Sequence, residues 1–415
     1  MTTSPANPID CRALACGATL LVEPMASVAS VAMSWLLPTG NAGDPADRLG
    51  EAAMLSELAL RGAGELDSRT FSDALDRLGV QRSLSNGGRH LRLGATMLGS
   101  RLDDAAPLLC DLVRRPRLPE EALEAVRSLS LQSLESLQDE PQRRAMIALG
   151  EQHLPSPFNR SGLGSRAGLE AISIEHLRGR WHREVRPGGS IIAVAGRVDP
   201  AALASRLDAL LEGWEGEAVQ PEVDAAAAKG AVHLEQDSAQ VHFGMALDAP
   251  PLRDPDSMAW ALAVRILGGG SSSRLFVELR ERRGLCYSVG AGADLGRDRG
   301  MVSIYAGSTP ERIDESRSLI LEGLASLAAG FTEAEFRRAS MALRRSLVAQ
   351  SESTTSRAVQ LASDYDRLGR ARTLAEIAES ASRIDLARLE AFAASHLDEA
   401  WIEARSEVRL GPPRS

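Results

Sequence analysis

The stretch that most constrains this chain is residues 267–289, LGGGSSSRLFVELRERRGLCYSV. Its three consecutive glycines leave the backbone free of Cβ constraints, and any of the three serines that follow can cap the start of a helix. From Arg274 the apolar side chains fall on one face of a helix and the charged side chains on the other. Gly284 suits the end of this helix, and Leu285–Val289 has the pattern of a strand.

A glycine-rich loop before a helix allows two interpretations. Free N–H groups at the start of a helix can bind a phosphate. However, neither Gly-Lys-Ser/Thr nor the GxGxxG pattern follows here. The alternative is a tight turn from a strand into a helix, without a ligand. On local features alone, the sequence favours the turn.

Composition limits the class of protein. The 415 residues allow two or three domains, and 44% hydrophobic with 25% charged residues is typical of a soluble globular chain. The net charge of −9 argues against nucleic acid as the main partner. The four cysteines lack CxxC spacing and predict neither a disulfide framework nor a zinc knuckle. Without a signal-peptide pattern or an apolar run of about 18 residues, we expect a cytoplasmic protein that does not bind membranes.

Apolar periodicity predicts strands and helices in both halves of the chain. A hairpin is expected around Asn86-Gly87, and alternation of apolar residues predicts a strand over 239–247. Thr332-x-x-Glu335 is a capping box that opens a long helix. The best linker candidate is residues 215–230, with its alanine run. This linker sets the expected domains at residues 1–220 and 221–415.

The opening stretch resembles a known family. The pattern LGGG-x-SSRLF-x-E-x-RE-x-RGL-x-YSV is similar to the C-terminal-half signature of pitrilysin/insulinase zinc peptidases, in the mitochondrial-processing-peptidase-like branch. The resemblance covers nearly the whole chain. In that family an arginine and a tyrosine at this spacing reach the substrate from the half opposite the metal. Arg280 and Tyr287 match the pair, although an exposed helix charge and a core aromatic are the plainer alternatives. The loop residues expected to bind substrate are Gly268, Gly269, Gly270, Ser271 and Ser272.

The family's metal site is an inverted His-x-x-Glu-His motif shortly before a Lys/Arg-Gly pair, with the two histidines on one helical face. Anchored on Arg61-Gly62, the three positions fall on Ala53, Ser56 and Glu57. Both histidines and the glutamate base are therefore missing. No other His-x-x-Glu-His occurs in the chain.

The family's third ligand is a glutamate on a later helix, here expected over residues 119–140. Its position falls on or near Ser133. Glu135 is close in sequence, but two residues along a helix place it about 200° round the axis. Because a catalytic metal needs its ligands, we predict no metal in this chain and a structural role for both helices.

The resemblance implies an α+β fold of two similar domains, each a mixed β-sheet with helices packed on one face. Such chains enclose a peptide chamber by pairing with a second chain. We therefore expect a non-catalytic, substrate-binding subunit of a heterodimeric zinc metalloendopeptidase, with the zinc in a homologous partner subunit and a peptide as substrate. The alternative is a metal-free homodimeric peptide-binding or scaffolding protein. An enzyme of different chemistry has less support, because no Ser-His-Asp or Cys-His arrangement is evident.

Overall fold

The computed structural model describes residues 9–413, which form two compact units, each built around its own sheet. The expected α+β fold with two sheet-containing units is confirmed. The first unit consists of the residues up to Ser136, Arg160–Val223 and Ala349–Leu374. The second unit consists of Leu137–Asn159, Asp224–Val348 and the residues from Ala375 onward.

The units interleave along the sequence. The chain changes unit between Val223 and Asp224, next to the division expected at residue 220. Two further segments belong to the unit of the other half of the sequence: 137–159 lies in the second unit and 349–374 in the first. If the chain were divided into two fragments at residue 220, the first unit would therefore lose residues 349–374 and the second unit would lose residues 137–159.

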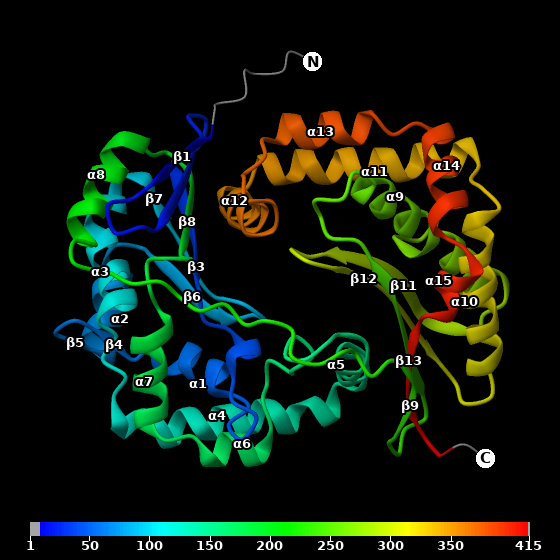
Figure 1. The fold of residues 1–415 in the computed structure, drawn as a ribbon, viewed down its shortest axis with the longest axis horizontal. Helices are drawn as coiled ribbons and strands as arrows, with labels where there is room; N and C mark the ends of the chain where they lie inside the picture. Colours follow the sequence, from blue (N-terminus) through cyan, green and yellow to red (C-terminus); the bar gives the residue numbers. More distant parts are fainter. Residues whose placement is uncertain (1–8, 414–415) are drawn as a thin grey trace. The chain divides into compact units, whose positions relative to one another are not determined.

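The first sheet is mixed, with strand order β1-β2-β8-β3-β7-β6 (Figure 1). β2 and β8 are parallel, and the other neighbouring strands are antiparallel. β6 and β7 form the hairpin predicted around Asn86-Gly87. The strands are β1 (Asp10–Ala13), β2 (Thr19–Pro24), β3 (Ser30–Leu37), β6 (Gln81–Asn86), β7 (Leu91–Leu98) and β8 (Ile191–Gly196).

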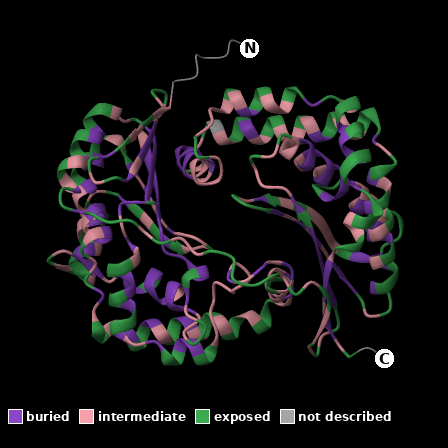
Figure 2. Cartoon of the chain, in the orientation of Figure 1, coloured by how far each residue is buried: buried purple, intermediate pink, exposed green. Residues whose placement is uncertain are grey.

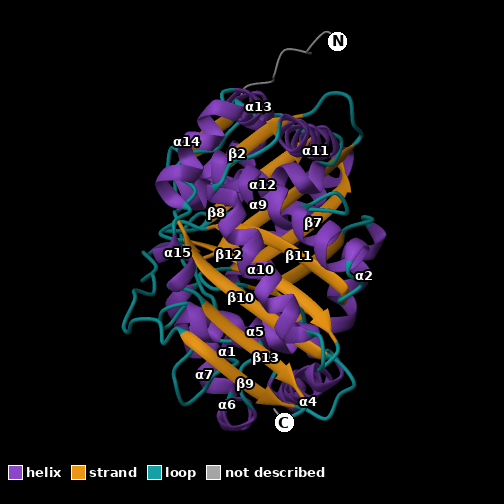
Figure 3. Cartoon of the chain, turned by 90° about the vertical axis from the view of Figure 1, so that its right-hand side faces the viewer, coloured by secondary structure: helices purple, strands orange, loops and turns teal. Residues whose placement is uncertain are grey.

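The second sheet has the order β9-β13-β10-β12-β11, and its strands lie side by side in Figure 3. β9 and β13 are parallel, and the other neighbours are antiparallel. Apart from β1, the two sheets thus share one topology, which supports an internal duplication. The strands are β9 (Gly230–Glu235), β10 (Val241–Ala249), β11 (Cys286–Leu295), β12 (Gly300–Ser308) and β13 (Ser406–Gly411).

The main helices cover one face of each sheet. In β10, alternate residues from Val241 to Leu247 point into this core, as their alternation predicts. The helices of the first unit include α1 (Glu51–Leu58), α2 (Ser68–Arg77), α3 (Leu102–Arg114), α4 (Leu123–Ser136), α6 (Arg166–Ala171), α7 (Ile174–Glu184) and α8 (Pro200–Leu210). Those of the second include α9 (Ser257–Gly268), α10 (Ile313–Ala328), α11 (Glu333–Ser351), α13 (Leu374–Ser382), α14 (Leu386–His396) and α15 (Glu399–Glu403).

In addition, one helix from an interleaved segment lies on the second face of each sheet. α12 (Thr354–Leu368) packs on β3 and β8, and its buried side chains include Leu361 and Ala362 (Figures 1 and 2). Its buried Arg357 donates hydrogen bonds to the carboxylate of Glu23 in β2. α5 (Pro141–His153) packs on β10 and β13 in the second unit. No helix is predicted over residues 141–153, so α5 is visible only in the structure.

A buried ion cluster fixes the N-terminus of α1, the helix that corresponds to the family's metal helix. The carboxylate of Asp44 accepts hydrogen bonds from the backbone N–H groups of Gly50 (2.7 Å) and Ala52 (3.1 Å). Arg180 of α7 is fully buried and pairs with Asp44 and, at 2.9 Å, with Glu184. Buried charges are tolerated only when they are paired and hydrogen-bonded. The cluster therefore ties α1 to α7.

Candidate functional site

The glycine-rich loop of the second unit joins two helices, α9 and the π-helix η5 (Phe276–Arg282). The turn from a strand into a helix favoured by local sequence is therefore wrong. Gly268 is buried, and a Cβ there would lie 2.4 Å from the backbone nitrogen of Ala291 in β11. Close packing of α9 on β11 thus requires glycine at this position. Gly269 and Gly270 are exposed.

The serines of the loop do not cap the following helix through their side chains. Ser273 is buried, and its Oγ donates to the carbonyl oxygen of Gly270 at 2.6 Å. Ser271 and Ser272 are exposed. A helix follows where the periodicity from Arg274 predicts it, but its hydrogen bonds are of the π type. Such π segments are rare in proteins, and those that exist are often found at functional sites.

Arg280 and Tyr287 lie together on the surface of the second unit. The guanidinium carbon of Arg280 is 4.8 Å from the ring centre of Phe276 and 5.4 Å from that of Tyr287. Tyr287 is 79% exposed because it is the extra residue of a β-bulge between Cys286 and Ser288. The bulge turns the phenol out of the sheet. The core-aromatic alternative for Tyr287 is therefore wrong.

Polar side chains of the neighbouring strands β10, β11 and β12 form a hydrogen-bonded group on the sheet. The phenol oxygen of Tyr305 is 2.7 Å from Nδ1 of His242. Burial raises the pKa of Tyr305, and a hydrogen bond with Ser288 partly offsets this. Burial also lowers the pKa of His242, so this imidazole is neutral at neutral pH. Burial raises the pKa of Cys286, which therefore stays a thiol.

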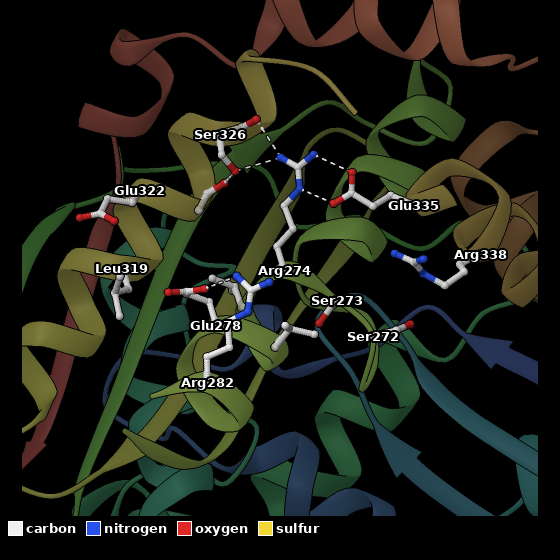
Figure 4. Close-up of a pocket in the computed structure, with 13 residues that line it drawn as sticks. Ser272, Ser273, Arg274, Glu278, Arg282, Leu319, Glu322, Ser326, Glu335 and Arg338 are labelled. Atoms are coloured by element: carbon white, nitrogen blue, oxygen red, sulfur yellow. Dashed lines mark hydrogen bonds and ion pairs between the residues drawn. The ribbon is translucent and has the colours of Figure 1, made fainter. Parts of the chain in front are cut away.

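A cavity of about 430 Å³ lies beside the loop, between η5, α10 and α11 (Figure 4). Arg274 crosses it and donates to the carboxylate of Glu335 at 2.7 and 3.0 Å and to the carbonyl oxygens of Ser326 and Gly330. The hydrogen bonds from Arg274 hold the pKa of Glu335 at about 2. Glu335 also forms the predicted capping box with Thr332. These bonds fix the loop to α11.

The positions that correspond to the family's zinc ligands lie on α1, in the first unit. Ala53 has no ligand atom, and Ser56 is buried with its hydroxyl donating to the Ala53 carbonyl oxygen at 2.7 Å. Glu57 is exposed. A lone carboxylate does not hold zinc, which takes three or four protein ligands.

The expected third position offers no ligand either. Ser133 on α4 is exposed and donates to the carbonyl oxygen of Leu129, while Glu135 pairs with Arg166. Among residues 9–413, no group of three or more His, Cys, Asp or Glu side chains could hold a metal ion. The residues at these positions do not fit zinc.

We expect the purified chain to bind no stoichiometric zinc and to cleave no peptide by itself. The reason is that these positions lack the family's two zinc-binding imidazoles and its glutamate base. Ala53, Ser56 and Glu57 supply only one carboxylate in their place. Elemental analysis after incubation with zinc and gel filtration measures this directly. One tightly held zinc per chain would contradict the prediction.

Residues 171–343 match the model described as Peptidase M16 inactive domain. This match and the relatives below support the resemblance to the peptidase M16 family. The chain is 26% identical over 399 residues to an uncharacterized zinc protease of Mycobacterium leprae, covering 93% of this chain and 88% of that protein. An uncharacterized zinc protease of Bacillus subtilis is 24% identical, with 91% and 93% of the two chains covered.

Two solved structures share the fold of this chain. A peptidase M16 inactive domain from Pseudomonas fluorescens superposes with a TM-score of 0.88 at 20% identity, covering 98% of both chains. A protease from Helicobacter pylori gives a TM-score of 0.86 at 16% identity, covering 98% of this chain and 100% of that one. Among the described residues of this chain, none of the helices has the length and apolarity to cross a membrane.

Proposed function

We propose that this chain is the non-catalytic, substrate-binding subunit of a heterodimeric zinc metalloendopeptidase of the mitochondrial-processing-peptidase-like branch. The observation that carries the proposal is the contrast between two positions. The bulge in β11 presents Arg280 and Tyr287 to solvent, whereas α1 supplies no ligand set for a metal. A homologous partner that holds zinc would complete the site.

In this proposal the two side chains act on the substrate in trans. The Tyr287 hydroxyl donates a hydrogen bond to the oxygen that gains negative charge during peptide cleavage. Arg280 donates to substrate carbonyl oxygens and orients the peptide. Its contact with the rings of Phe276 and Tyr287 restrains the guanidinium, so less side-chain freedom is lost on binding.

The heterodimer is tested by co-expressing this chain with an M16 homologue that has an intact zinc motif. Native mass spectrometry should show a one-to-one complex that cleaves peptides, because each chain supplies what the other lacks. As a control, the homologue alone should be much less active. Separate species would contradict the heterodimer. A persistent homodimer of this chain would favour the alternative, a metal-free peptide-binding or scaffolding protein.

A further inference from the structure

A second, smaller cavity lies on the other side of the glycine-serine loop. It measures about 190 Å³ and lies between α9, the loop and α11, all in the second unit. Ser272, Ser273, Glu335 and Arg338 line both this cavity and the larger one, so the loop forms part of the wall that the two cavities share. The smaller cavity is not part of the surface formed by Arg280 and Tyr287.

Three arginines converge on this smaller cavity: Arg265 from α9, and Arg338 and Arg345 from α11. The last two are seven residues apart, so they share one face of α11. In the part of the chain that the structure describes, none of the three guanidinium groups has a hydrogen-bonding or ion-pair partner. Figure 4 shows the Arg338 side chain extending from α11 toward the loop, with no interaction drawn to it.

The one carboxylate at the cavity does not neutralise these charges. Glu335 is already engaged by both arms of the Arg274 guanidinium and by Thr332. This pairing leaves Arg265, Arg338 and Arg345 as an excess of positive charge on a chain whose net charge is −9. Like charges that face one cavity repel one another, and an anion between them removes that cost.

The loop adds neutral donors to the same wall. Within residues 9–413, the backbone N–H groups of Gly270, Ser271 and Ser272 have no hydrogen-bond acceptor. Ser271 and Ser272 are exposed residues, and each also carries a hydroxyl group. Successive free N–H groups next to arginines suit a planar anion, which can accept from a guanidinium fork and from the backbone together.

We propose that this cavity binds a side-chain carboxylate of the peptide, so that the protein selects peptides with an acidic residue. This inference rests on the proposed peptide-binding function and specifies its substrate class. The carboxylate accepts from Arg338 and Arg345 on one side and from the loop N–H groups on the other. A guanidinium fork matches the two oxygens of a carboxylate, which an amide of the same shape cannot replace.

The test is fluorescence anisotropy with the full chain and two fluorescein-labelled peptides that differ only by three glutamates replaced with three glutamines. The glutamate peptide should bind roughly five- to tenfold more tightly at low salt, as expected for one or two charge-assisted hydrogen bonds at a partly exposed site. Arg338→Gln should remove most of this preference. Arg344→Gln is the matched control, because Arg344 is also an exposed arginine of α11 but does not line the cavity.

The possible results of the anisotropy experiment separate the acidic-residue pocket from peptide binding itself. If both peptides bind equally, or if Arg344→Gln removes as much preference as Arg338→Gln, the acidic-residue pocket is wrong and peptide binding itself survives. If neither peptide binds this chain or its complex with the zinc-binding homologue, the proposed function fails as well. If inorganic phosphate displaces the glutamate peptide at equal concentration, the cavity is a site for small anions and not for a peptide side chain.

Discussion

Tyr287→Phe in this chain is expected to lower the kcat of the reconstituted complex by about 10²–10³, the usual effect of losing one positioned oxyanion donor. The substitution keeps the ring that contacts Arg280 and removes only the hydroxyl. Because Tyr287 is 79% exposed and its hydroxyl has no hydrogen-bond partner among the described residues, folding and assembly should not change. Steady-state kinetics on the complex, with assembly checked by size exclusion, measures the effect.

Two further variants make this result specific. Arg280→Ala should weaken substrate binding, because a charge-assisted donor is lost. Tyr365→Phe is the control, since it removes a phenol hydroxyl in the first unit that accepts a hydrogen bond from Thr19. Normal kcat for Tyr287→Phe in an intact complex would exclude the shared-site mechanism, although the heterodimer itself could remain.

Arg180→Met is expected to destabilise the first unit by about 3–5 kcal/mol, the usual cost of breaking a buried ion pair by removing one partner. The substitution leaves the carboxylate of Asp44 buried without the guanidinium of Arg180, whereas Glu51 keeps its ion pair with Arg48 at 2.7 Å. Asp44 also holds the N-terminus of α1, so the loss should spread to that helix. Denaturant unfolding is followed by tryptophan fluorescence, because three of the five tryptophans lie in this unit and Trp181 lies on the same helix as Arg180.

Arg183→Met is the matched control for this experiment. Arg183 lies on the same helix and also contacts Glu184, but its side chain is 68% exposed. Exposed ion pairs contribute about 0–1 kcal/mol, so the control should change stability little. Equal effects of the two substitutions would show that burial of the Arg180 cluster does not stabilise α1.

Periodicity and end signals predicted the elements whose cause is local. Alternation of apolar residues located β10, and the Asn86-Gly87 pair located the β6–β7 hairpin. The capping box at Thr332 and Glu335 marked the start of α11. The pattern match also selected Arg280 and Tyr287, which the structure brings into contact. These features depend on neighbours in sequence, which a single chain records directly.

Features that depend on distant residues could not be predicted in this way. The bulge that exposes Tyr287 arises from the pairing of β11 with β12, and a strand pattern alone suggests a buried aromatic. The bond between Arg274 and Glu335 joins residues far apart in sequence, and the capping box was the one signal that marked Glu335. α5 was missed because residues 141–153, which follow the expected helix of residues 119–140, were assigned no element from their sequence pattern.

The interleaved helix α12 has a consequence for the order in which the chain folds as it is synthesised. The other segments of the first unit have all been synthesised once the chain reaches Val223. The segment that contains α12, Ala349–Leu374, is synthesised much later. At about 5–20 residues per second, this interval is on the order of ten seconds. During it, the face of the first sheet formed by side chains such as Leu21, Leu36 and Ile191 has no helix to cover it. Chaperones that bind apolar strands on the ribosome therefore have a defined target in the nascent chain.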